Sequence, residues 1–210
     1  MQHIYSSIDT NAYVLQCKTN KKKDINSMSY LIERELSQSD CIKMGYGIEN
    51  VMKEYILSNN RANLVNIKPK NTKGQKEKDH LFMDDAAKII YYAELKSNLN
   101  LDTEKCKSTS EKCLTVEKEL KEEFPDYDVR MFLVSNRHYC RDIIPGIIMK
   151  KYSNVENNVV GMRDYFHAVE VNFPFDGEDE YKLWLNYLAD KMFSVEAVAE
   201  AVAVASPETL

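Results

Sequence analysis

The sequence predicts an α/β protein with a mixed central β-sheet flanked by helices, on three features of its middle section. Two short apolar segments on either side of a polar turn at residues 85–88 have the pattern of a β-hairpin. Apolar residues at helical spacing follow over residues 108–124, and the compact apolar run 129–134 is typical of a buried strand. Strand, helix and buried strand make a crossover unit. The strand that ends near Glu94 and the strand at 129–134 are therefore expected to be parallel neighbours.

The same patterns assign the segments outside this unit. Good helix caps and apolar residues at a period of 3.6 predict helices there, and Pro69 ends a short strand. The elements expected are a helix beginning at residue 26 or 27, a helix around 48–56, a strand at 64–67, a strand at 166–171 and a helix at 181–193. We divide the chain into an N-terminal arm (1–25), one domain (26–194) and a tail (195–210) that is either a frayed helix or disordered.

Composition narrows the class of protein. The chain is 44% apolar and 29% charged, as in soluble globular proteins. No apolar run approaches the roughly 18 residues that cross a bilayer, and the N-terminus has no secretory pattern. The five cysteines are scattered and odd in number, which favours free thiols in a reducing compartment. We therefore expect a cytoplasmic protein without a membrane partner.

Charge is distributed unevenly along the chain. The net charge of −5 does not by itself indicate a nucleic-acid binder. Lys73, Lys76 and Lys78, however, belong to a basic segment that leads directly into Asp79. Such a segment suits phosphate binding beside a carboxylate cluster, and a solvated lysine-rich loop is the alternative.

The hairpin is expected to gather charged groups at its open end. Folding about residues 85–88 puts Asp79 opposite Glu94, and alternation along the strand turns Glu94 and Lys96 to one side. Two carboxylates suffice to hold Mg²⁺, which prefers oxygen ligands and keeps several waters; the Leu95 carbonyl is a further candidate ligand. Lys96 would orient or deprotonate a water, or stabilise charge on a phosphate, and the sequence does not choose among these roles. These residues predict a metal-dependent nuclease.

Surface charges on an edge hairpin are the plain alternative. Against it, residues 89–93 are apolar on both faces, which indicates a central strand. An unpaired charge buried at the end of such a strand would cost several kcal/mol.

Asp79 together with Glu94-Leu95-Lys96 at the end of a hydrophobic strand resembles the PD-(D/E)XK nuclease superfamily, and most of all its type II restriction endonucleases. The resemblance implies the order helix, three strands, helix, strand, which matches residues 46–134. It also implies Mg²⁺, with Mn²⁺ as a substitute, and a further metal-binding glutamate in a Gly-x-x-x-Glu context, which Gly45 and Glu49 match. Lys78 stands where the family has a proline. Asp84 and Asp85 compete for the role of Asp79 but fall in the turn, at the other end of the hairpin.

The resemblance implies a site-specific endonuclease that hydrolyses double-stranded DNA to 5′-phosphate and 3′-hydroxyl ends. A homodimer and a companion DNA methyltransferase in the host are then expected as partners, with the C-terminal part of the domain serving DNA reading or dimerisation. Two alternatives stay open: a structure-specific repair or recombination nuclease of the resolvase kind, and a non-catalytic DNA-binding protein.

Polar residues after the two buried strands are weaker candidates for DNA contacts. Asn98 and Asn100 either bond to DNA or cap a turn. Arg137 and Arg141 follow the second buried strand and would read guanine edges or grip phosphates. The lysines at the start of the following helix, Lys112 among them, either touch the DNA backbone or lie on a solvated face, and the solvated face is favoured.

Overall fold

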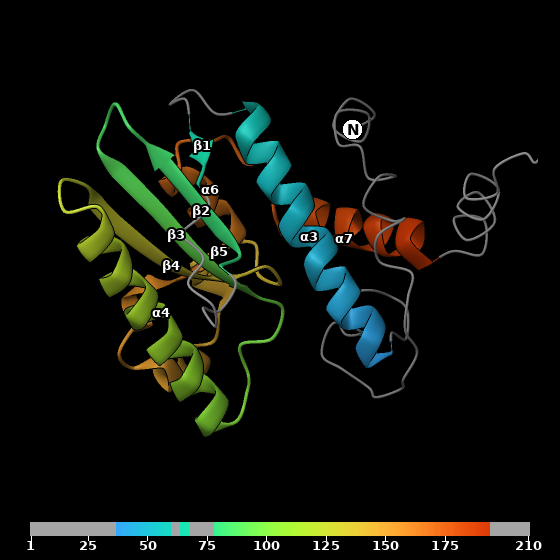
Figure 1. Cartoon of the computed structure of the whole chain (residues 1–210). Coiled ribbons are helices and arrows are strands. Elements are labelled where there is room, and N and C mark those ends of the chain that lie inside the picture. The colour runs from blue at the N-terminus through green and yellow to red at the C-terminus, as the bar shows by residue number, and fades with distance from the viewer. Residues whose placement is uncertain (1–36, 60–63, 68–77, 194–210) are drawn as a thin grey trace, which may run out of the picture. The chain divides into compact units, whose positions relative to one another are not determined.

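The computed structural model describes residues 37–59, 64–67 and 78–193 (Figure 1). The expected arm (1–25), the helix beginning at 26 or 27 and the tail (195–210) lie outside the described residues. The described residues fall into two compact units, one formed by residues 53–174 and the other by those before 53 and after 174. No helix in the described part of the chain is both long and apolar enough to cross a membrane.

Residues 53–174 form an α/β unit around a five-stranded sheet in the order β1-β2-β3-β4-β5. Strands β1 to β3 pair antiparallel, and β3, β4 and β5 pair parallel, so the sheet is mixed. Its strands are β1 (Val65–Asn66), β2 (His80–Asp84), β3 (Ile89–Lys96), β4 (Asp128–Ser135) and β5 (Val159–Gly161). The predicted mixed sheet and the parallel pairing of β3 with β4 are confirmed.

The register of the β2–β3 hairpin matches the prediction. The chain forms a turn at residues 85–88, and the two residues of each β2–β3 pair lie at equal distances along the chain from the centre of this turn. The pairs are His80–Ala93, Leu81–Tyr92, Phe82–Tyr91, Met83–Ile90 and Asp84–Ile89. One more step along this register puts Asp79 opposite Glu94.

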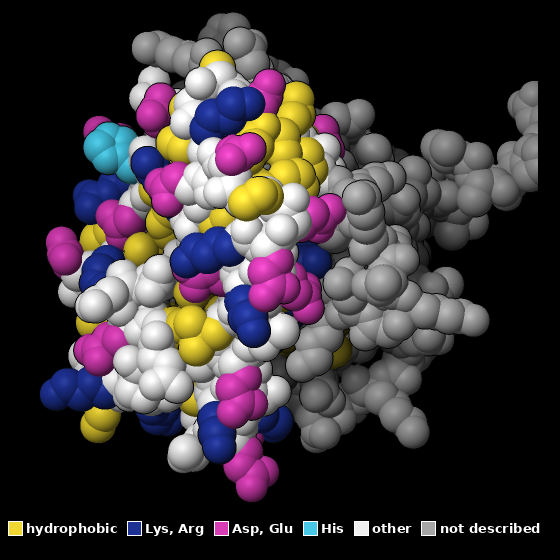
Figure 2. Space-filling view, turned by 60° about the vertical axis from the view of Figure 1, so that its left-hand side comes forward, with side chains coloured by type: hydrophobic (Ala, Val, Ile, Leu, Met, Phe, Trp, Pro, Cys, Tyr) yellow, Lys and Arg dark blue, Asp and Glu magenta, His cyan; other side chains and the backbone are white. Residues whose placement is uncertain are grey.

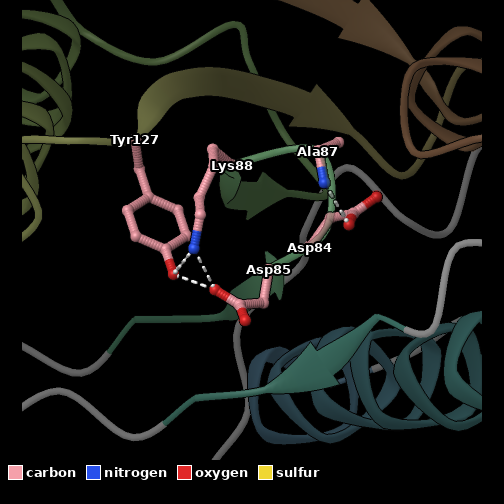
Figure 3. A network of polar contacts seen from close by, with 5 residues as sticks. All are labelled: Asp84, Asp85, Ala87, Lys88 and Tyr127. Carbon is pink, nitrogen blue, oxygen red and sulfur yellow. Dashed lines mark hydrogen bonds and ion pairs between the residues drawn. The ribbon is translucent and has the colours of Figure 1, made fainter.

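Side chains within the turn and at the start of β4 hold the closed end of the hairpin (Figure 3). Asp84 Oδ1 accepts a hydrogen bond from the Ala87 amide at 2.9 Å. Lys88 adopts a φ of 56° and donates from Nζ to Asp85 Oδ1 at 2.7 Å. The Tyr127 hydroxyl donates to the same oxygen of Asp85. Asp84 and Asp85 are therefore engaged at the turn, at the opposite end of the hairpin from Asp79.

Helix α4 (Thr103–Glu123) connects β3 to β4 and covers one face of the sheet (Figure 1). It begins five residues before the predicted start at 108, because Asp102 accepts a hydrogen bond from the Lys105 amide and caps it. Its buried stripe comprises Cys106, Ser110, Cys113, Val116 and Leu120. The apolar members of this stripe pack with residues of β2, β3 and β4 in the core of this unit.

Between β4 and β5 the chain forms short helical turns, and α6 (Met162–Ala168) follows β5. The turns are η2 (Arg141–Ile143), α5 (Gly146–Met149), η3 (Lys150–Tyr152) and η4 (Glu156–Asn158). Phe132 of β4 contacts Tyr165 of α6, whereas its neighbours Met131 and Leu133 face the α4 side. Helices α4 and α6 therefore pack on opposite faces of the sheet.

The predicted strand at 166–171 is wrong, because residues up to Ala168 belong to α6. The buried residues Met162, Tyr165, Phe166 and Val169 follow the spacing i, i+3, i+4, i+7. That period becomes visible only when the window is extended back to Met162. On the side away from β3, β4 pairs parallel with the three-residue strand β5, which was not predicted.

Gly161 allows a close approach between two segments of this unit. A Cβ at this position would lie 2.4 Å from Cys140 Cα and 2.6 Å from Cys140 N, which are backbone atoms that cannot rotate away. We expect Gly161→Ala to lower the free energy of unfolding by at least about 2 kcal/mol through overpacking, measured by denaturant titration. Gly146→Ala is the matched control, since nothing lies within 4 Å of its added Cβ. Equal stabilities of the two variants would contradict this account.

The other unit contains most of α3 (Gln38–Asn59) and the whole of α7 (Glu178–Phe193). Ser37 Oγ accepts a hydrogen bond from the Asp40 amide at 3.2 Å and caps α3. A Cβ on Gly47 would lie 2.9 Å from Met192 Sδ, so α3 and α7 approach closely there. The helices predicted at 48–56 and 181–193 are confirmed.

Candidate active site

Glu94 lies on the central strand β3 and is only 1% exposed. A carboxylate at such a position requires charged or hydrogen-bonding partners. Lys96 Nζ lies 2.6 Å from Oε1, and Lys112 Nζ lies 2.5 Å from Oε2. The Tyr92 hydroxyl also donates to Oε2, at 3.2 Å. Alternation along β3 brings Tyr92, Glu94 and Lys96 to the face that α4 covers, and Lys112 reaches them from α4.

Asp79 joins this cluster from the neighbouring strand. It immediately precedes β2, and its Oδ2 accepts a hydrogen bond from the Leu95 amide at 2.6 Å. Burial raises the pKa of Asp79, the nearby charge of Glu94 raises it further, and Lys96 opposes both effects. The two carboxylates therefore repel each other within one site, as the hairpin register predicts.

The pKa of Glu94 moves the other way. Burial raises the pKa of Glu94, but Lys96 and Lys112 together more than offset this and hold it below its usual value. Glu94 is therefore a carboxylate at neutral pH.

Lys96 is held as a cation. Burial lowers the pKa of Lys96, whereas the charges of Glu94 and Asp79 raise it to a net value above the usual one. The sequence left open whether Lys96 deprotonates a water or stabilises charge. A raised pKa favours the charge-stabilising role, because a general base must be neutral near the working pH.

The oxygen atoms of this cluster are of the type that binds a divalent cation. Asp79 and Glu94 supply carboxylate oxygens from adjacent strands, and Mg²⁺ completes its shell with water. A cation would also relieve the repulsion that raises the pKa of Asp79. Within residues 37–59, 64–67 and 78–193, His, Cys, Asp and Glu form no group of three or more that could hold a metal. The predicted third ligand, Glu49, lies on α3 in the other unit, and its role stays a prediction.

Lys78, Asn98 and Asn100, which the sequence named as candidates for DNA contacts, have partners within the protein. Lys78 is 4% exposed at its side chain and pairs with Glu119 of α4 at 3.8 Å. Asn98 Oδ1 accepts from the Asn100 amide at 2.8 Å, which is the turn-capping alternative. Asn100 Oδ1 in turn accepts from Lys151 Nζ at 2.7 Å.

Arg141 is likewise engaged within the protein. Its Nη1 donates to the carbonyl oxygens of Glu156, Asn157 and Val159 and so fixes the segment that leads into β5. Arg137 is half-buried in the turn after β4. The DNA contact expected of Arg137 stays a prediction. Lys73 and Lys76 lie outside the described residues.

Lys112 is the member of the cluster that sequence reasoning missed. It was expected on a solvated face, but its side chain is 15% exposed and contacts Glu94. One signal pointed to it: Lys112 stands four residues before Val116, so it borders the apolar stripe of α4.

Lys and Arg side chains alternate with Asp and Glu over the coloured part of the face in Figure 2. This face therefore shows no basic surface of the kind that binds nucleic acid without regard to sequence.

Comparison of the chain with protein-family models, with curated proteins and with solved structures finds no match.

Proposed function

We propose that this protein is a Mg²⁺-dependent DNA endonuclease of the PD-(D/E)XK type. The observation that carries the proposal is the convergence of Asp79, Glu94 and Lys96 at the open end of the β2–β3 hairpin. The order α3, β1, β2, β3, α4, β4 supports it, because the resemblance implies the same order. A buried acidic pair with perturbed pKa values beside a cation is typical of functional sites.

Asp79 and Glu94 would hold the cation, which supplies an activated water and neutralises charge on the phosphate when bound. Lys96 contributes a fixed positive charge to the phosphate, because its ammonium is retained at neutral pH. The Leu95 amide orients Asp79 by donating to Oδ2. Tyr92 holds one oxygen of Glu94 through its hydroxyl.

The substrate in this proposal is double-stranded DNA, cut at specific sites to leave 5′-phosphate and 3′-hydroxyl ends. Cutting both strands of a symmetric site implies a homodimer with twofold symmetry. A companion methyltransferase that protects the host's DNA is part of the same proposal. The net charge of −5 favours a site-specific enzyme over a resolvase-like nuclease that recognises DNA by shape and depends more on a basic surface.

Digestion of unmethylated phage DNA with Mg²⁺ or Mn²⁺, followed by sequencing of the ends, tests the proposal. Discrete fragments with a common end sequence are expected. Cleavage of branched DNA alone would mean a resolvase-like enzyme. If neither metal supports cleavage while DNA is still bound, the protein is a non-catalytic DNA-binding protein.

We expect Lys96→Ala to reduce the rate of cleavage by about a hundredfold or more, because a preorganised charge at the phosphate is lost. DNA binding, measured by gel shift without added metal, is expected to survive. Lys105→Ala is the matched control, since the Lys105 side chain is 71% exposed and pairs with Asp102 at the start of α4. Equal loss of cleavage in both variants would argue against the role given to Lys96.

A further inference from the structure

Lys112 differs from the other lysines of α4. The side chains of Lys105, Lys107, Lys118 and Lys121 are 56–79% exposed, and each pairs with an acidic residue three or four positions away or at the helix cap. The Lys112 side chain is 15% exposed and reaches across to β3, where its Nζ lies 2.5 Å from Glu94 Oε2.

Both oxygens of Glu94 consequently carry an ammonium group, Lys96 on Oε1 and Lys112 on Oε2. Asp79 and Glu94 contribute two negative charges and the two lysines two positive ones, so the cluster is formally neutral as it stands. A divalent cation that binds Glu94 competes with these ammonium groups for the carboxylate and is repelled by both positive charges.

Lys96 and Lys112 reach Glu94 from different elements of the fold. Lys96 is on the same strand as Glu94, and both lysines are attracted by Asp79. Lys112 comes from a separate helix, and its flexible four-carbon chain lets the ammonium move without a change in the backbone.

We propose that Lys112 is a built-in counter-ion that competes with the divalent cation for Glu94 and so weakens cation binding by the protein alone. The inference rests on the proposed function, because it assumes that Glu94 binds the cation. It extends that function, because Lys112 keeps the cluster neutral and lowers its affinity for the metal. In this role Lys112 is a positioning residue that acts through Glu94.

Titration of the full-length protein with Mn²⁺, followed by the EPR signal of the free ion, tests the inference. Lys112→Met is expected to bind Mn²⁺ at least about tenfold more tightly than the wild type, because one opposing charge at contact distance is removed. Lys112→Arg keeps the charge and should stay within about threefold of the wild type. Lys107→Met removes a 75% exposed charge from the same helix and should have no effect.

An unchanged or weaker Mn²⁺ affinity in Lys112→Met, with an unaltered circular dichroism spectrum, would overturn the inference. So would a lack of Mn²⁺ binding by every variant. Phage DNA digestion on the same samples separates the two proposals. A tenfold gain in Mn²⁺ affinity without DNA cleavage by any sample would contradict the nuclease assignment and support the counter-ion role of Lys112. Cleavage without a gain in affinity would support the nuclease assignment and contradict the counter-ion role.

Discussion

Asp79→Asn is expected to abolish Mg²⁺-dependent cleavage and at the same time to raise the melting temperature. Asparagine keeps an oxygen that accepts from the Leu95 amide, so the local structure is retained. The negative charge that would hold the cation is lost, and cleavage should fall by at least about a hundredfold. The charge on Asp79 is unfavourable in the folded protein, because burial and Glu94 raise its pKa.

The sign of the stability change follows from linkage. The folded protein binds the Asp79 proton more tightly than the unfolded chain does, so ionisation of Asp79 costs stability as the pH rises above its unfolded pKa of about 4. The gain from Asp79→Asn should therefore be present at pH 7 and disappear in acid, as measured by calorimetry at several pH values.

Asp85→Asn is the matched control at the opposite end of the hairpin. Hydrogen bonds from Lys88 and Tyr127 lower the pKa of Asp85, so removing this charge should reduce stability at pH 7 and leave cleavage unchanged. A lower melting temperature for Asp79→Asn, together with normal cleavage, would show that Asp79 is a structural residue.

Glu94→Ala is expected to lower the free energy of unfolding by about 3 kcal/mol, the usual cost of removing one partner from a buried ion pair. Two ammonium groups, on Lys96 and Lys112, lose their carboxylate. The side chain of Lys112 is 15% exposed and has little access to water, whereas that of Lys96 is 31% exposed. Most of the cost should therefore come from Lys112. Denaturant titration measures it.

A double-mutant cycle isolates that contribution. Adding Lys112→Met to Glu94→Ala removes the stranded charge, so the double variant should be more stable than Glu94→Ala alone. When Lys107→Met is added to Glu94→Ala instead, the two changes in the free energy of unfolding should add, because the 75% exposed side chain of Lys107 has no part in the cluster. Additive behaviour of the Lys112 pair would refute a strong coupling between Glu94 and Lys112.

The sequence predicted the hairpin, its register and the crossover to β4 because these features are encoded locally. The turn at 85–88 fixes which residues face each other, so Asp79 and Glu94 could be paired by counting alone. The buried run in β4 is long enough to be recognised by itself. Short elements are not encoded in this way. The three-residue strand β5 has no pattern of its own, and the predicted strand 166–171 contains only the second half of the helical pattern of α6.

By itself the sequence determined the central hairpin and the three residues that converge at its open end, since strand alternation and turn position depend only on neighbours along the chain. The tertiary structure decided which other charged side chains contact that cluster and which pair elsewhere. Packing of α4 on the sheet brings Lys112 to Glu94 and pairs Lys78 with Glu119. The reason is that long flexible lysine side chains take their partners from whatever element packs against them, and that element is fixed by burial of its apolar face.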